Sequence, residues 1–149
     1  MTGSARQCVA AALGSVLLAV PPLALSESAG FGDYTVYYQA VNSTFIDAGI
    51  ATQYGIVRGD RRAFLNISVS KSGNGAMAAV PAVVAGGKRN LLGQVGAIPF
   101  REIREEHAIY YIGEFEFSNA EILRFTISVQ PEGAGPEHEI RWETRLYSD

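Results

Sequence analysis

Alternation of apolar and polar side chains is the feature of this sequence that most limits its fold. It is clearest in two stretches, RAFLNISVSK at 62–71 and LRFTISVQ at 123–130. Successive side chains of a β-strand point to opposite faces, so each stretch would bury one face and leave the other in water. The apolar positions that we expect in the core are Leu65, Ile67, Val69, Phe125, Ile127 and Val129.

Clusters of turn-forming residues recur at short intervals and divide the chain into about seven strands. We predict these strands at 33–41, 62–71, 77–86, 91–101, 108–117, 123–130 and 138–147, with Trp142 of the last one also in the core. Such spacing predicts an all-β fold, a single immunoglobulin-like antiparallel β-sandwich, although the paired cysteines of antibody domains are absent. One short helix is expected at 47–55, where Asp47 would cap it and Gly55 would end it.

The N-terminal residues have the order of a secretory signal peptide. Arg6 precedes an uncharged apolar run at 9–20, two prolines end the run, and small residues follow. The run is short for a membrane span, although an uncleaved anchor is the competing interpretation. We therefore predict a signal peptide at 1–26, a β-sandwich domain at 27–149, and a periplasmic location.

Charge and cysteine content narrow the possible partners. The whole chain has a formal net charge of −3, and loss of Arg6 with the signal would make the rest more negative. This balance argues against nucleic acid or an anionic membrane surface as the partner. Cys8, the single cysteine, would also leave with the signal, so no disulfide and no thiolate chemistry are expected.

One charged stretch, FREIREEHAIYYIGEFEF at 100–117, could in principle carry acid–base chemistry. Glu105, Glu106 and His107 lie directly before an apolar alternation. The interpretation that we favour is a solvated turn from Arg101 to His107 that joins two strands, because loops need water for their backbone groups. On this interpretation the protein is not an enzyme and has no catalytic residue.

Metal and cofactor sites are not expected either. His107 and His138 are the two histidines, and a blue-copper site would need a cysteine beside them. If PEHEI is extended, Glu137 and Glu139 point away from His138 and cannot easily join it. We therefore predict no metal and no cofactor. A nucleophilic serine is not indicated either, because the sequence contains no G-x-S-x-G motif.

The longest uncharged run of the domain, SGNGAMAAVPAVVAGG at 72–87, suggests a partner-binding edge. A central strand covered on both faces is the competing interpretation, but Pro81 cannot donate to a ladder and favours an edge. Charge usually protects an edge strand, and here only Lys71 and Lys88 flank the run. We predict that a segment of an envelope protein pairs here, with the contact residues Met77, Ala79, Pro81, Ala82 and Val84.

Four motifs together resemble a bacterial family catalogued as domain of unknown function 4426. They are FGDYTVYYQAVNSTFI at 31–46, AVPAVVAG with NLLGQV at 79–95, FREIREEHAIYYIGEFEF at 100–117 and LRFTISVQPEG at 123–133. The resemblance covers nearly all of the chain after the signal. It implies a small exported protein of Gram-negative bacteria, and it brings no established activity and no catalytic residue.

The function that fits these observations best is that of a small periplasmic, non-catalytic protein that binds another protein or a small ligand. One alternative is a chaperone-like partner that pairs strands with an envelope protein. Another is an enzyme with a site built from Glu105, Glu106 and His107, which would require these groups in a dry, concave pocket.

Export makes a direct prediction about the chain ends. Cleavage after Ser26 would give a protein that starts at Glu27, because Ala24, Leu25 and Ser26 form the best small-x-small site. Intact-mass measurement of protein from the periplasm checks this start. A chain that keeps Met1 and stays in the soluble cytoplasmic fraction would contradict export.

Overall fold

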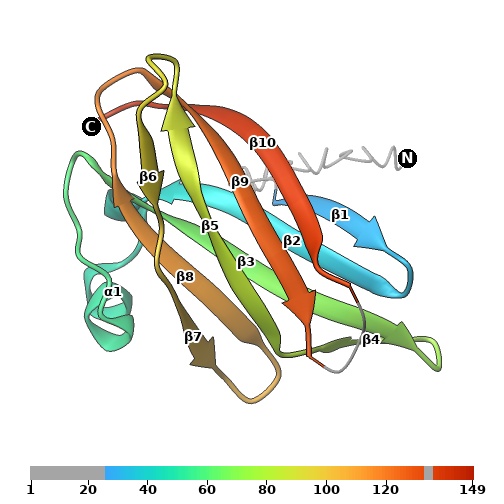
Figure 1. Ribbon diagram of the computed structural model, residues 1–149. Helices are drawn as coiled ribbons and strands as arrows, with labels where there is room; N and C mark the ends of the chain where they lie inside the picture. Colours follow the sequence, from blue (N-terminus) through green and yellow to red (C-terminus); the bar gives the residue numbers. More distant parts are fainter. Residues whose placement is uncertain (1–25, 133–135) are drawn as a thin grey trace, which may run out of the picture.

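Two antiparallel sheets packed face to face form the protein in the computed structural model, which describes residues 26–132 and 136–149 (Figure 1). Sheet A has the order β1-β2-β3-β8-β7, with β4 also paired to β3, and sheet B has the order β10-β9-β5-β6. The predicted all-β sandwich is therefore confirmed, whereas the predicted signal peptide lies outside the described residues apart from Ser26. The strands are β1 Glu27–Phe31, β2 Tyr34–Asn42, β3 Arg62–Gly73, β4 Ala76–Ala79, β5 Ala82–Asn90, β6 Val95–Ala97, β7 Phe100–Arg104, β8 Ile109–Glu116, β9 Glu121–Pro131 and β10 His138–Leu146.

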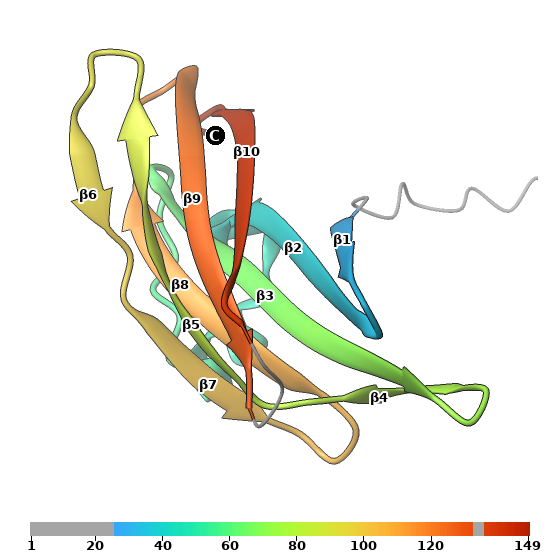
Figure 2. The same ribbon diagram turned by 45° about the vertical axis from the view of Figure 1, so that its right-hand side comes forward.

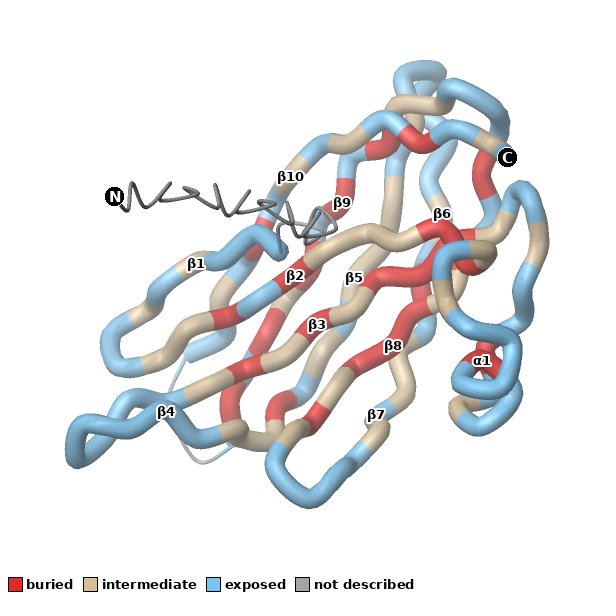
Figure 3. The backbone as a smooth tube through the Cα atoms, turned by 180° about the vertical axis from the view of Figure 1, so that it is seen from behind, coloured by how far each residue is buried: buried red, intermediate tan, exposed pale blue. Residues whose placement is uncertain are grey.

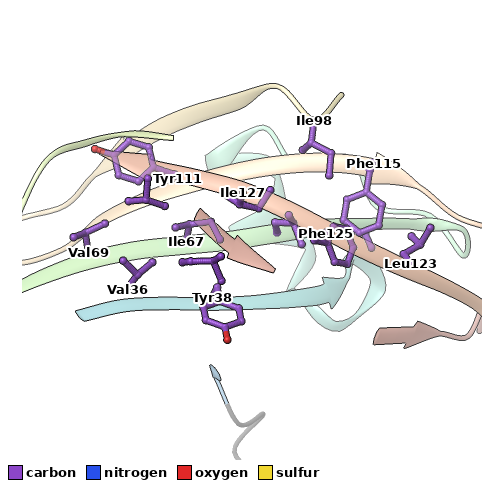
Figure 4. Close-up of a cluster of buried hydrophobic side chains, with 14 of the residues drawn as sticks. Val36, Tyr38, Ile67, Val69, Ile98, Tyr111, Phe115, Leu123, Phe125 and Ile127 are labelled. Carbon is purple, nitrogen blue, oxygen red and sulfur yellow. The ribbon is translucent and has the colours of Figure 1, made fainter. Parts of the chain in front are cut away.

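The core lies between the sheets and uses the predicted alternation (Figure 4). All six core positions predicted from the two alternating stretches are at most 1% exposed. Trp142 is only partly buried, and its ring packs 4.9 Å from that of Phe125 and 4.7 Å from that of Tyr38. Phe115 meets Phe125 edge to face at 5.3 Å, an arrangement that aromatic rings favour.

The described residues contain more strands than predicted, because two of the predicted strands are each divided between the sheets. The segment 77–86 is not one strand: β4 pairs with β3 in sheet A, and β5 pairs with β9 in sheet B. The division falls at Pro81. The amide of Val80 makes the last bond to Val69 in sheet A (2.9 Å), and the carbonyl of Pro81 then accepts from Glu132 beside sheet B (3.0 Å).

The predicted strand at 91–101 divides in the same way around Pro99. The amide of Ile98 donates to the carbonyl of Gly86 in sheet B (3.0 Å), and Phe100 then pairs with Gly113 in sheet A. Proline has no amide hydrogen and cannot continue a ladder, so both crossings occur where pairing has to stop. Figure 2 shows β6 and β7 following one another along the edge of the sandwich. One further strand, β1, was missed because its sequence ESAGF has little alternation.

A tyrosine hydroxyl connects the first crossing to sheet A. The hydroxyl of Tyr111 accepts a hydrogen bond from the amide of Ala82 (2.7 Å) and donates one to Oε2 of Glu102 (2.9 Å). Burial raises the pKa of Tyr111, and hydrogen bonds from Arg104 and then Tyr111 lower the pKa of Glu102. The chain end of β5 is thus held against β8 by a polar bridge at the margin of the core.

Truncation in the core should be strongly destabilising. Phe125→Ala should lower the free energy of unfolding by about 3–5 kcal/mol, because the ring is 1% exposed and its loss leaves a cavity. Urea denaturation checks this value. Val83→Ala is the control, since Val83 is 60% exposed and its truncation should change stability by no more than about 0.5 kcal/mol. A similar, small effect of both changes would contradict the core described above.

Candidate functional site

The charged stretch that suggested catalysis is divided between a strand and an exposed turn. Residues 101–104 lie in β7, so the predicted turn is too long at its start, while Glu105, Glu106 and His107 do form the β7–β8 turn. The side chains of Glu106 and His107 are each 88% exposed and lie 3.6 Å apart. Glu106 and His107 are therefore surrounded by water rather than enclosed in a dry pocket.

The predicted partner-binding residues do not share one strand. Met77 and Ala79 belong to β4, Pro81 lies at the crossing, and Ala82 and Val84 belong to β5. Strand pairs in the described residues join β4 to β3 on one side only. A hollow of about 550 Å³ separates residues 77–79 from the turn segment 104–109, so the fold brings these two predicted regions together.

A different surface has the character of a binding groove, namely the outer face of sheet A beside α1 (Ala48–Tyr54). Figure 3 shows this helix on the face of sheet A that turns away from sheet B. Strand residues that point outward here are apolar, although the outer face of a sandwich is ordinarily polar. A second apolar cluster results, in which the buried members are Ala51, Ile56, Phe64 and Ile112.

We call the hollow at this cluster the α1 groove; its volume is about 450 Å³, within the usual range for small-molecule sites. Apolar side chains dominate its lining, with a few polar groups among them. The lining residues are Gln39, Val41, Phe45, Ile46, Ile50, Tyr54, Ile56, Phe64, Asn66, Ile103, Glu105, Tyr110 and Ile112. On the helix side of the groove, Phe45 is 75% exposed and Ile50 is 45% exposed, so two apolar side chains stand at its rim.

The helix that borders the groove begins and ends as its sequence predicts. Oδ1 of Asp47 accepts from the amides of Gly49 (2.8 Å) and Ile50 (3.2 Å), which satisfies two free donors of the first turn. Gly55 ends the helix with φ of 65°, a left-handed conformation that glycine adopts without strain. Both predicted ends of the helix are thus confirmed.

One end of the groove is closed by a contact between α1 and the β7–β8 turn. The hydroxyl of Tyr54 donates to Oε1 of Glu105, and this hydrogen bond is the main cause that raises the pKa of Tyr54. Glu105, which could have been a catalytic acid, instead anchors the helix to the turn. Beyond the same end of the helix, the amide of Val57 donates to Oε1 of Glu114 (2.8 Å).

Asn66 gives the groove unused hydrogen-bonding capacity. Its Oδ1 is buried and has no hydrogen-bond partner among the described residues. Such a group is rare in a native protein and costs about 1–3 kcal/mol when left unpaired. Since Asn66 lines the groove beside Gln39, a polar group on a bound molecule would have partners there.

The sequence held a signal for this groove that alternation alone concealed. Phe64, Tyr110 and Ile112 occupy positions of the polar phase in their strands, and so does Val41 in β2. Apolar residues in both phases indicate a strand covered on both faces. The short helix predicted at 47–55 is the element that provides part of this second cover.

The histidines of the described chain are on separate elements. His107 lies in the β7–β8 turn, whereas His138 begins β10 and stacks on Phe31 with ring centroids 4.3 Å apart. Nowhere in residues 26–132 and 136–149 do three or more histidine, cysteine, aspartate or glutamate side chains gather as potential metal ligands. Within the same residues, no helix has both the length and the apolar character needed to cross a bilayer.

Comparison with known proteins identifies the family. The model of the family described as "Domain of unknown function (DUF4426)" matches residues 28–149. The chain belongs to the DUF4426 family. A crystal structure of a DUF4426 family protein from Pseudomonas aeruginosa PAO1 is similar, with a TM-score of 0.73, 31% sequence identity, and coverage of 83% of this chain and 96% of that chain. The resemblance deduced from the four motifs is thereby confirmed.

Two further structures resemble this DUF4426 protein in fold alone. Both are of FetP from uropathogenic Escherichia coli strain F11, one a copper-bound variant and one the as-isolated protein expressed recombinantly in the periplasm of E. coli. Each has a TM-score of 0.60 over 83% of this chain, with 9% and 8% identity and coverage of 95% and 94% of the FetP chains. No curated protein matches the chain.

Proposed function

We propose that this DUF4426 protein is an exported, non-catalytic binding protein of the periplasm that holds an apolar ligand in the α1 groove. The observation that carries the proposal is a hollow of about 450 Å³ on a sheet face that ordinarily faces water, lined mainly by apolar side chains. Export rests on the order of charge, apolar run and small residues at the N-terminus.

The groove favours a ligand with an apolar body and one polar group. Burial of an apolar surface in the groove would contribute about 25 cal/mol for each Å² removed from water. Gln39 and Asn66, which line the groove, could bind the polar group. A non-catalytic role is supported by the exposure of Glu106 and His107, since acid–base catalysts usually lie in enclosed sites.

Ligand binding can be tested with the fluorescent probe N-phenyl-1-naphthylamine, which is apolar and brightens when it leaves water. Ile50→Glu should weaken probe binding about tenfold or more, because it places a charge at the rim of the groove. Val83→Glu is the matched control, since it changes an exposed apolar residue of sheet B and should leave binding unchanged. Equal effects of the two changes, or no binding by the unchanged protein, would refute the proposal.

A second candidate function is strand pairing along β4, which the open side of this strand favours. β4 pairs only with β3 in the described residues, and its residues Ala76–Ala79 carry no charge. An unprotected edge is a template for another extended chain. On this proposal, a segment of an envelope protein adds beside Met77 and Ala79 in the hollow next to the β7–β8 turn.

A photo-activated cross-linking residue at position 79 tests strand pairing in intact cells. We expect a discrete adduct with one envelope protein, and Ala79→Lys should abolish it because a charge protects the edge. Because Ala79 is partly buried against the core at the base of the β3–β4 hairpin, the same loss should also be seen for Met77→Lys, whose side chain is 49% exposed, and circular dichroism of this second variant should be unchanged. Cross-linking that gives only the monomer would refute this candidate.

A further inference from the structure

The turn between β5 and β6 carries the most exposed cluster of aliphatic side chains in the described chain. Leu91 is 58% exposed, Leu92 is 85% exposed, and Val95 at the start of β6 is 69% exposed. We call residues 90–95 the leucine turn. The turn stands at the end of the sandwich in two views of the molecule (Figures 1 and 2).

Asn90 fixes the shape of the leucine turn. Its Oδ1 accepts from the amides of Leu92 (3.1 Å) and Gln94 (2.9 Å), and its Nδ2 donates to Oε1 of Gln94 (2.7 Å). The amide of Gly93 donates to the carbonyl of Asn90 (3.0 Å), and the φ of Gly93 is 83°. The two leucines are therefore held outward in one arrangement, so little conformational entropy is lost when they enter another phase.

Positive side chains surround the leucine turn. A hollow of about 640 Å³ next to it is lined by Arg61, Arg62 and Lys88 together with residues of the turn. Arg145 lines the hollow on its other flank, which also contains Leu91 and Leu92. Cations beside exposed leucines are the combination that the interface of an anionic bilayer attracts.

The acidic side chains near the turn are already engaged. Oε1 of Glu116 lies 3.0 Å from Nη1 of Arg62. Glu121 accepts from Nδ2 of Asn90 (3.2 Å) and from the amide of Ser118 (2.7 Å). Lys88 is engaged as well, because its Nζ donates to the carbonyl of Glu116. Four basic side chains thus line the two hollows with two acidic ones, and the exposed Arg61 and Arg145 are the cations placed to meet a further anion.

We propose that the leucine turn docks this protein on the surface of a bilayer that contains anionic phospholipid. Leu91 and Leu92 enter the interface, while the exposed Arg61 and Arg145 lie against lipid phosphates. Docking of this kind is reversible and needs no membrane-spanning segment. The α1 groove lies on the other sheet and stays free, so this docking is independent of the proposed ligand binding.

The negative charge of the whole chain does not prevent such docking. Salt screens charges over about 8 Å at physiological ionic strength, so the side chains beside the membrane decide the attraction. A bilayer also suits a projecting turn better than a protein pocket does, because lipids adapt to its shape. Because of its negative net charge, the protein is not steered toward an anionic membrane over long distances, so its association with the bilayer should be slow.

Vesicle co-sedimentation tests the proposal. The protein should bind vesicles with about 30% phosphatidylglycerol in phosphatidylcholine about tenfold more tightly than pure phosphatidylcholine, and salt at about 0.5 M should remove this difference. Replacing both Leu91 and Leu92 by Ser should reduce binding about tenfold or more, because burial of even one leucine is worth that much. Arg61→Glu should reduce the preference for anionic vesicles.

The control is Val83→Ser, which changes an exposed aliphatic residue at the opposite end of β5 and should leave binding unchanged. All variants are compared on the same chain, so any lipid affinity of the N-terminal apolar run cancels. Equal binding by the double leucine variant and the control would overturn the proposal. Absence of binding to either kind of vesicle would also overturn it and would indicate a protein partner with an acidic, apolar surface instead.

Discussion

The absence of an amide hydrogen at two prolines sets two of the places where this chain changes sheets. At Pro81 the chain leaves sheet A for sheet B, and at Pro99 it returns. Every strand between these positions belongs to sheet B, and β7 can extend sheet A only because the chain has come back. A ladder that continued through either proline would need a donor that does not exist. A third change of sheet, from β8 to β9, takes place at the turn 117–120, which contains no proline.

Two of the three surfaces to which we assign binding, the leucine turn and the α1 groove, contain segments placed by these crossings. The segment between the prolines folds back on itself as β5 and β6, and its reversal is the leucine turn at the end of the molecule. The segment after Pro99 supplies Ile103 and Glu105 to the side of the α1 groove. One surface is apolar and enclosed, and the other is apolar and projecting, so they suit ligands of different kinds. Neither uses the core that holds the sheets together.

Alternation predicts the core of this protein well because the inner face of each strand packs against the opposite sheet. Leu123, Phe125, Ile127 and Val129 are buried in the order that the sequence indicates. On the outer face of β3 and β8 the alternation does not hold. Phe64 and Ile112 occupy positions where a polar residue is expected, and they are buried because α1 covers this face. The helix itself could be predicted from Asp47 and Gly55, but its docking position depends on contacts distant in sequence. Distant contacts also decide the segments 77–86 and 91–101. Their local composition predicts one strand each, whereas in the structure each segment changes sheet at its proline.

At two adjacent glycines in sheet B there is no room for a side chain. A Cβ on Gly86 would lie 2.2 Å from the carbonyl oxygen of Thr126, and one on Gly87 would lie 2.5 Å from that of Gly96. At these two consecutive residues the main chain of β9 and that of β6 approach β5 closely, one on each side. Any divergent chain that retains this sandwich has almost no freedom to vary these two positions, however freely the leucine turn beyond them changes. Substitution in the β5–β6 hairpin is thus restricted at Gly86 and Gly87 and is less restricted at its tip, the leucine turn. The tip can therefore change its binding specificity without disturbing sheet B.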